Sequence, residues 1–367
     1  MAISQYKNQK KPLEYSKNEI DRAARDIRHG MDDTGRSEAI RRIQGFREYH
    51  LYPLMLMKNH LARIASQVSN KVLVARRLKR LSTIIDKLER PTLDGHNTNS
   101  IKLTRMQDIA GCRAIVKNIK QLKQLQKKLE SSRSVHKIVS IKDYLTPKES
   151  GYGGVHLVYS CYENQLADHE WKKAKVEVQL RTELQHAWAT SLEIIDTLEQ
   201  INLKTRHDGH DDWRKLFSIA GRLVSHEEKA CVIEDAQTLI SLRQELCELA
   251  DKLDVVLKLA RYILAITFTT DHKAVKQGRS GQGLFLVCMH ILEEQEKKIQ
   301  VTVKHFSMKN SEKALAELNE ADLNEKIIIS VLVSASDVRA LKQAYPNYFG
   351  STRKFSDFLE RQRGDLG

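Results

Sequence analysis

The chain has 367 residues, of which 41% are hydrophobic and 29% are charged, a balance typical of a helix-rich globular protein. It contains no run of about eighteen apolar residues and begins without an apolar signal core, so we expect no membrane span and a cytoplasmic location. The five cysteines are scattered and never spaced as CxxC, which disfavours a disulfide framework and a thiolate zinc site. The formal net charge of +14 predicts an anionic partner, such as a nucleotide, RNA or the ribosome, without choosing among them.

The first 70 residues are expected to be helical. Ser16 and Glu19 have the spacing of a capping box and predict a helix that runs to about residue 28. A second helix is expected at 37–49, and Pro53 is expected to begin a third. Because this region has no strand pattern, we interpret 1–70 as a helical packing scaffold.

Residues 71–230 have the pattern of an α/β domain. Strands are expected near Val72, in the segment MQDIAGCRAIV, and in three later segments, VHKIVSIKDYL, GVHLVYSCYE and AKVEVQLRT. Helical segments lie between these strands, so we predict a mixed sheet of about five strands flanked by helices.

The strand KVEVQLRT alternates between apolar and polar residues, and its polar face carries Glu177, Gln179 and Arg181. Thr182 and Gln185 follow with the spacing of a second capping box and predict the start of a helix. The polar face can be a surface salt bridge or the floor of an active site. The alternation does not decide between the two.

The stretch GYGGVHLVY, 151–159, places Tyr152 and His156 beside glycines at the start of an expected strand. Glycine permits backbone conformations and close approaches that other residues forbid. The stretch can be an ordinary hairpin turn, or a turn that offers an aromatic ring to a flat ligand. These nine residues alone favour the ordinary turn.

The last third of the chain is expected to form a long amphipathic helix at 231–275, a glycine-rich basic linker at 276–283, and a small α+β module at 284–367. The module's strands are expected near 284–291, 299–306 and 326–334. A cut in the linker, near Gln277, is expected to leave a folded domain, because each side shows its own apolar pattern.

Four segments of the chain carry charged and aromatic residues in a distinctive order. They are RLKRLSTIIDK, with Arg77, Lys79 and Lys87; DIAGCR, with Asp108 and Arg113; KDYLTPKESGYGGVH, with Lys142, Lys148, Tyr152 and His156; and EVQLRTELQH, with Glu177, Gln179, Arg181 and His186. In this order and spacing they resemble the synthetase motifs of the RelA/SpoT family over roughly residues 71–195. The sequence departs from the family at Gly153 and Gly154, where a polar residue and a serine are usual.

The resemblance implies a nucleotidyltransferase-like synthetase fold and an ATP-dependent pyrophosphokinase. The family transfers the β,γ-diphosphate of ATP to the 3′-hydroxyl of GDP or GTP and makes the alarmones (p)ppGpp. With about 70 residues before the region, a small enzyme without the family's hydrolase domain is expected. Two alternatives stay open. One is a toxin-type member that modifies the 3′ end of tRNA or an adenosine nucleotide and is inhibited by its own C-terminal module. The other is a non-catalytic RNA- or ribosome-binding protein.

The resemblance also implies roles for individual residues. Glu177 is the expected general base, and Asp108 and Glu177 are the expected ligands of Mg²⁺, a cation that takes carboxylate and phosphate oxygens. The expected ATP-binding residues are Arg77, Lys79, Lys87 and Arg113. The expected acceptor-binding residues are Tyr152, His156, Lys142, Lys148, Gln179, Arg181 and His186, with Tyr152 stacking on the acceptor base. ATP and GDP or GTP are the expected partners, with tRNA as a further candidate, and no oligomeric state is predicted.

Overall fold

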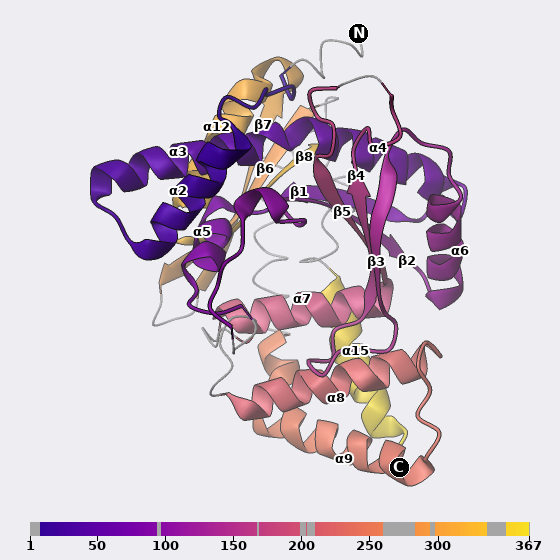
Figure 1. Cartoon of the computed structure of the whole chain (residues 1–367). Coiled ribbons are helices and arrows are strands. Elements are labelled where there is room, and N and C mark those ends of the chain that lie inside the picture. Colours follow the sequence, from indigo (N-terminus) through magenta and orange to yellow (C-terminus); the bar gives the residue numbers. More distant parts are fainter. Residues whose placement is uncertain are drawn as a thin grey trace.

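A mixed five-stranded sheet lies at the centre of the computed structural model, which describes residues 8–93, 97–166, 169–198, 203, 210–259, 283–293, 298–335 and 350–366 (Figure 1). Its strands are β1 (Leu73–Leu78), β2 (Ala110–Val116), β3 (Lys137–Tyr144), β4 (Gly154–Ser160) and β5 (Lys175–Thr182). The order across the sheet is β1-β2-β5-β4-β3. Strands β2 and β5 are parallel and the other neighbours are antiparallel. The predicted mixed sheet of about five strands is confirmed.

The N-terminal region is helical, as predicted, with α2 (Lys17–His29), α3 (Asp33–Tyr49) and α4 (Leu51–Ser66). The capping box that begins α2 is present, because Ser16 and Glu19 each accept a hydrogen bond from the other's backbone amide. α5 (Leu81–Glu89) follows β1 and packs against α2.

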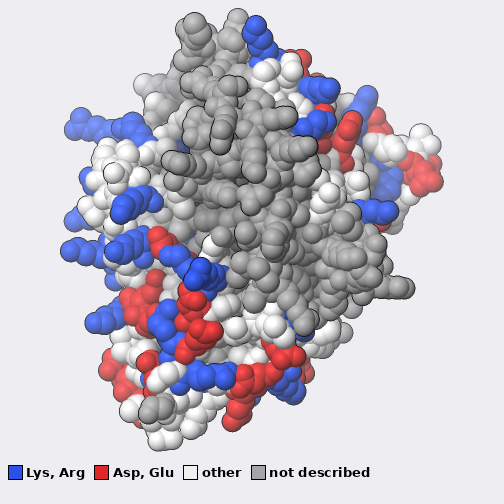
Figure 2. Space-filling model, turned by 180° about the vertical axis from the view of Figure 1, so that it is seen from behind, with Lys and Arg blue, Asp and Glu red and all other residues white. Residues whose placement is uncertain are grey.

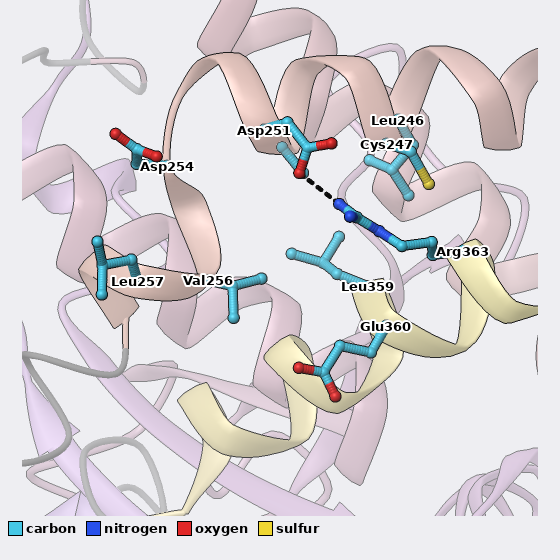
Figure 3. A pocket seen from close by; sticks show the side chains of 10 residues that line it. Leu246, Cys247, Asp251, Asp254, Val256, Leu257, Leu359, Glu360 and Arg363 are labelled. Carbon is cyan, nitrogen blue, oxygen red and sulfur yellow. Dashed lines mark hydrogen bonds and ion pairs between the residues drawn. The ribbon is translucent and has the colours of Figure 1, made fainter.

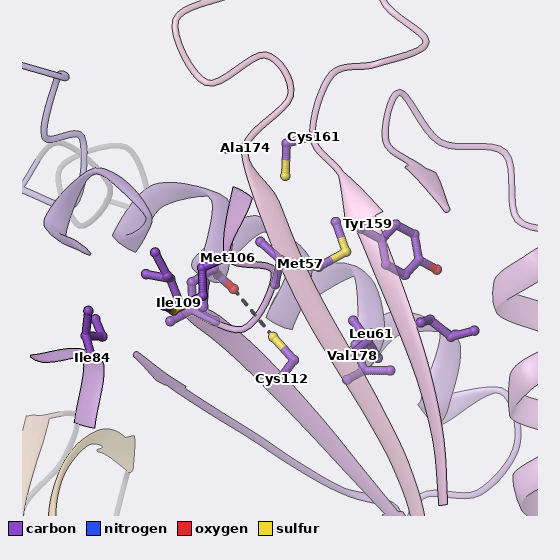
Figure 4. Packing of buried hydrophobic residues seen from close by; sticks show 14 of the residues in the cluster. Met57, Leu61, Ile84, Met106, Ile109, Cys112, Tyr159, Cys161, Ala174 and Val178 are labelled. Carbon is purple, nitrogen blue, oxygen red and sulfur yellow. Dashed lines mark hydrogen bonds between the residues drawn. The ribbon is translucent and has the colours of Figure 1, made fainter. Parts of the chain in front are cut away.

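One face of the sheet is covered by α4 and by α6 (Ile119–Glu130), and it holds the main core. The apolar face of β5 supplies Val176, Val178 and Leu180, each 0% exposed, as the alternation predicts. Met57 and Leu61 of α4 pack over this face (Figure 4). The polar face of the sheet is thereby left to point the other way.

A second cluster of helices lies below the sheet in Figure 1. It consists of α7 (Glu183–Leu198), α8 (Asp211–Glu227), α9 (Ala236–Lys252) and α15 (Ser351–Gly364). Thr182 and Gln185 form the predicted capping box at the start of α7. The rings of Phe217 and Phe355 are stacked with centroids 5.8 Å apart, so the C-terminal helix belongs to the core of this cluster.

The long helix expected at 231–275 is interrupted. α9 is capped by Asp235 and ends at Lys252, and Asp254 has a φ of 51°, which breaks the helical path before residue 255. The apolar spacing continued through this point, so periodicity alone could not reveal the break. The rest of the expected helix and nearly all of the linker at 276–283 lie outside the described residues.

A smaller antiparallel sheet follows, with β6 (Gly283–Glu293), β7 (Lys298–Ser307) and β8 (Ile327–Ala335) in the order β7-β6-β8. α12 (Ser311–Leu323) packs on it, and Leu286, Phe306, Ala314 and Leu318 belong to its small core. The predicted strands of this module are confirmed. The division of the chain into four units remains a prediction.

Lysine and arginine side chains gather along the edge of the molecule where α6 lies, whereas acidic and basic side chains alternate over the lower helices (Figure 2). None of the five cysteines, all within described segments, forms a disulfide. No helix in the described part of the chain is long and apolar enough to cross a bilayer.

Candidate active site

The polar face of the large sheet brings together residues from four strands. Lys142 of β3 is paired with His156 of β4, His156 with Gln179 of β5, and Gln179 with Arg113 of β2. Directly paired residues project their side chains to the same face. The polar side chains of β5 therefore lie in a shared surface that neighbouring strands also line, and they do not form an isolated salt bridge.

A continuous chain of hydrogen bonds runs across this face. In order, it joins Arg181, Tyr152, His156, Glu177, Gln179 and Arg113. We call these six side chains the Glu177 chain. Sequence reasoning placed all six in the site but did not foresee that they bond to one another.

Two donor groups of the Glu177 chain are directed at the Glu177 carboxylate. The Nδ1 atom of His156 lies 2.8 Å from Glu177 Oε1, and Gln179 Nε2 donates to Oε2 over 2.7 Å. An ionised carboxylate can only accept, so His156 Nδ1 donates to Glu177, and His156 Nε2 is hydrogen-bonded to the Tyr152 hydroxyl. That hydroxyl in turn accepts from Arg181 Nη2 over 2.8 Å. Both oxygens of Glu177 are thus held in fixed positions.

Glu177 is ionised near neutral pH although its side chain is only 13% exposed. Burial raises the pKa of this carboxyl, but hydrogen bonds from His156 and Gln179 outweigh burial and hold the pKa below its ordinary value. A buried carboxylate that stays charged and is rigidly oriented can serve as a proton acceptor.

A second carboxylate, Asp108, lies just before β2. Lys79, directly after β1, places its Nζ 2.7 Å from Asp108 Oδ2, and Lys87 of α5 places its Nζ 3.6 Å from Oδ1. Burial raises the pKa of Asp108, but the two lysines together lower it below its usual range. Burial also lowers the pKa of Lys87, against the opposing effect of Asp108.

Two arginines extend the positive charge toward Glu177. Arg77 is paired with Gly111, and Gly111 with Glu177, so the residue between Arg77 and Glu177 in this row has no side chain. Burial, and then the nearby charge of Arg181, lower the pKa of Arg113 to about 10, which leaves the guanidinium charged at neutral pH. The face therefore combines several fixed cations with two ionised carboxylates.

The two carboxylates suit a divalent metal ion that also binds phosphate. Asp108 and Glu177 are close enough for the charge of Asp108 to raise the pKa of Glu177. Within the described segments no group of three or more His, Cys, Asp or Glu side chains could hold a metal ion. Mg²⁺ commonly takes one or two carboxylates and completes its shell with water and substrate phosphates, and the two carboxylates fit that arrangement.

The glycine-rich turn before β4 is pressed against α8. Gly151 has a φ of +84°, and a Cβ built there would lie 2.2 Å from the Phe217 carbonyl oxygen. A Cβ on Gly221 of α8 would lie 1.9 Å from the Gly151 carbonyl oxygen. Ser218 also donates to a carbonyl of this loop over 2.5 Å. This contact explains the glycine at 151, and sequence reasoning missed it because nothing local to α8 indicates its partner.

The ring of Tyr152 is held by edge contacts with aromatic neighbours. Its centroid lies 5.8 Å from that of Tyr144 and 6.2 Å from that of Trp188, both at steep angles. The Nζ atom of Lys148 lies 4.3 Å from the Tyr144 centroid. Tyr144 stands in the KDY segment that sequence reasoning singled out, but no role was assigned to it.

Two further acceptor-binding candidates, Lys142 and His186, are not members of the Glu177 chain, although Lys142 is paired with His156. Lys142 is exposed on the edge strand β3. His186 is 1% exposed in α7, where its carbonyl accepts a hydrogen bond from Thr190. The roles of all the predicted site residues remain predictions.

A pocket of about 630 Å³ lies elsewhere, between the end of α9 and α15 (Figure 3). Leu246, Val256 and Leu359 form part of its lining, and an ion pair between Asp251 and Arg363 crosses it. It contains none of the residues predicted for the site.

Comparisons with known proteins agree with the motifs. Residues 76–194, about a third of the chain, match the family described as "Region found in RelA / SpoT proteins". The GTP pyrophosphokinase YwaC of Bacillus subtilis (strain 168) is 33% identical over 115 residues, which cover 31% of this chain. The matched stretch spans about half, 52%, of that relative.

The solved structures that are similar to this chain include the following two. One is the small alarmone synthetase 1 of Bacillus subtilis bound to its product pppGpp, with 24% identity, 48% of this chain and 88% of the other covered, and a TM-score of 0.38. The other is a GTP pyrophosphokinase family protein of Streptococcus pneumoniae, with 24% identity, 51% and 89% covered, and a TM-score of 0.39.

Proposed function

We propose that this chain, whose residues 76–194 carry a RelA/SpoT synthetase region, transfers the β,γ-diphosphate of ATP to the 3′-hydroxyl of GDP or GTP. The observation that carries the proposal is Glu177, an ionised and nearly buried carboxylate held in place on a sheet face lined with cations. The cytoplasm, where these nucleotides are available, is the proposed location.

Glu177 is proposed as the general base. A sugar hydroxyl is a weak nucleophile, and a carboxylate within hydrogen-bond reach strengthens it by accepting its proton as the bond to phosphorus forms. His156 and Gln179 fix the direction of the two carboxylate oxygens, so the base does not have to be ordered when the acceptor arrives.

The cations of the β1 and α5 segments are proposed to hold the phosphates of ATP. Arginine binds phosphate oxygens through two parallel donors, and lysine acts as a point charge. Lys79 and Lys87 are paired with Asp108 in this structure, so phosphate binding would exchange their partner. Asp108, released from the lysines, and Glu177 would then hold Mg²⁺, which neutralises charge that develops on the phosphate oxygens.

The acceptor is proposed to bind on the β3–β4 side of the sheet. Lys142 and Lys148 would meet its phosphates and Tyr152 its base, with Arg181 and His156 fixing the tyrosine through its hydroxyl. The close contact between Gly151 and Gly221, which we call the Gly151–Gly221 clamp, holds the loop that carries Tyr152. This fixed position supports the proposal of a preformed acceptor site.

The acceptor can be identified directly. The purified full chain is incubated with ATP labelled at the γ-phosphate and, separately, with GDP, GTP, additional unlabelled ATP, or bulk tRNA. We expect the label to appear in the guanosine nucleotide with wild type and in no acceptor with Glu177→Gln. Label in tRNA or in an adenosine nucleotide alone would favour the toxin-type alternative, and no transfer to any acceptor would favour the non-catalytic one.

A further inference from the structure

A buried arginine outside the predicted site holds the backbone of Lys79. Arg47 of α3 is 2% exposed, and its Nε donates to the Lys79 carbonyl oxygen over 2.7 Å. The Lys79 amide donates to the Ile109 carbonyl oxygen over 2.7 Å. The backbone of Lys79 is therefore fixed on both sides, and its side chain reaches Asp108 from this fixed point.

The same arginine is held by the C-terminal module. Its Nη1 donates to Asn319 Oδ1 of α12 over 3.0 Å, although the two residues are 272 positions apart in the chain. Asn319 Nδ2 donates to Glu48 Oε1 over 3.1 Å, so the amide engages two consecutive residues of α3. Through this contact the module that carries β6, β7 and β8 touches Arg47, the residue that holds the backbone of Lys79.

We propose that Arg47 is a positioning residue for the ATP side of the site, and that the C-terminal module holds it in place through Asn319. The inference rests on the proposed function. The planar guanidinium can bond Lys79 and Asn319 at once only in one orientation. Arg47 Nη1 also donates to Gln44 Oε1 over 3.5 Å, so without Asn319 it loses its shorter bond and the guanidinium reorients toward Gln44. Lys79 then loses a support, and its ammonium group is held less well where the ATP phosphates bind.

If the module supports the ATP-binding side of the site, its effect on ATP affinity is opposite to that of a built-in inhibitor. An inhibitory module would raise donor affinity when its contact is broken, whereas a supporting module lowers it. Arg47 touches the Lys79 backbone and no expected substrate atom, so its effect should appear in ATP binding and leave the acceptor unaffected.

The test measures ligand affinities of the full-length protein by calorimetric titration. The donor probe is an ATP analogue with a methylene group between the α- and β-phosphates, which cannot be cleaved there, and the acceptor probe is GDP. The variants are Asn319→Ala, Arg47→Lys and their combination. Glu320→Gln, an exposed neighbour on the same turn of α12, is the matched control. Melting temperatures are recorded for every variant.

We expect Asn319→Ala to weaken analogue binding about three- to tenfold, the effect of one hydrogen bond, with GDP affinity and the control unchanged. Arg47→Lys should lose at least as much, and the double variant should lose no more than Arg47→Lys alone, because Asn319 acts through Arg47. Three outcomes overturn the inference: unchanged analogue affinity in Asn319→Ala, tighter binding, or an equal loss for both ligands together with a lower melting temperature. If wild type itself does not bind the analogue, the proposed function fails first.

Discussion

At the scale of single residues, the most informative side chain is Tyr152. Sequence reasoning predicts that its ring stacks on the acceptor base, and a ring alone would make Phe an adequate substitute. The structure adds a second use, because the hydroxyl joins Arg181 to His156 in the Glu177 chain. Local sequence could not reveal this link, since Arg181 and Tyr152 are 29 positions apart.

We therefore predict a split between the two Tyr152 variants. Tyr152→Phe should keep acceptor affinity but lower kcat, because His156 loses its partner and Glu177 is less firmly oriented. Tyr152→Ala should also weaken acceptor binding, by about 1–3 kcal/mol for the lost stacking. Steady-state kinetics with GDP varied, together with melting temperatures, would measure both effects. Normal kcat in Tyr152→Phe would show that the hydroxyl does not help to orient Glu177. Normal GDP affinity in Tyr152→Ala would show that the ring does not bind the acceptor base.

Glu228 provides a pH-dependent prediction. Burial raises its pKa to about 7, against a hydrogen bond from Thr182 that lowers it. Because the folded pKa lies above the unfolded one, the folded state binds the extra proton between about pH 4.5 and pH 7, and its stability falls as the pH rises through that range. Glu228→Gln should remove this fall and raise stability at pH 8 by on the order of 1–3 kcal/mol. Urea unfolding at pH 5 and pH 8 measures it, and an equal change at both values would contradict the assignment.

At the scale of elements, the sequence predicts strands and helices well where their signals are local. The alternation in KVEVQLRT places the polar face of β5 correctly, and both capping boxes form. The sequence does not predict contacts between elements that lie far apart in the chain. The close contact of α8 with the loop before β4 needs Gly151 and Gly221 together, and neither position indicates the other.

This contact predicts a large effect of one methyl group. Gly221→Ala would place a Cβ 1.9 Å from the Gly151 carbonyl oxygen, so the loop must move, and both acceptor affinity and melting temperature should fall. Gly45→Ala is the matched control, because a Cβ on Gly45 of α3 meets nothing within 4 Å. It should raise stability by about 0.4–1 kcal/mol. A Gly221→Ala protein with normal GDP binding would show that the clamp does not position the acceptor loop.

At the scale of the whole molecule, two helices of the C-terminal region pack against different parts of the chain. α12 contacts α3 through Asn319, and α15 packs into the cluster of α7, α8 and α9. Phe355 and Phe358 are both 0% exposed there. A fragment that ends near Gln277 would therefore lack part of this cluster's core, and the expectation that such a fragment folds remains a prediction. Apolar spacing shows that α15 has a buried face but does not show which partner covers it.

Loss of this contact should be measurable in stability. We predict that Phe358→Ala lowers the free energy of unfolding by about 3–5 kcal/mol and that a chain ending before α15 unfolds at a lower temperature. Denaturant unfolding followed by circular dichroism measures both. Native stability in the shortened chain would mean that α15 is not part of the cluster core.

The central claim is that the chain moves a diphosphate as one unit and that Glu177 enables the transfer. The measurement that tests it most directly is a count of AMP, ADP and modified acceptor in one reaction of ATP with GDP, for wild type and for Glu177→Gln. Wild type should release one AMP for each GDP converted to a 3′-diphosphate, with no AMP when GDP is omitted, and Glu177→Gln should stay folded and release almost none. ADP as the main product, AMP release that does not need the acceptor, or near-normal transfer by Glu177→Gln would contradict the account.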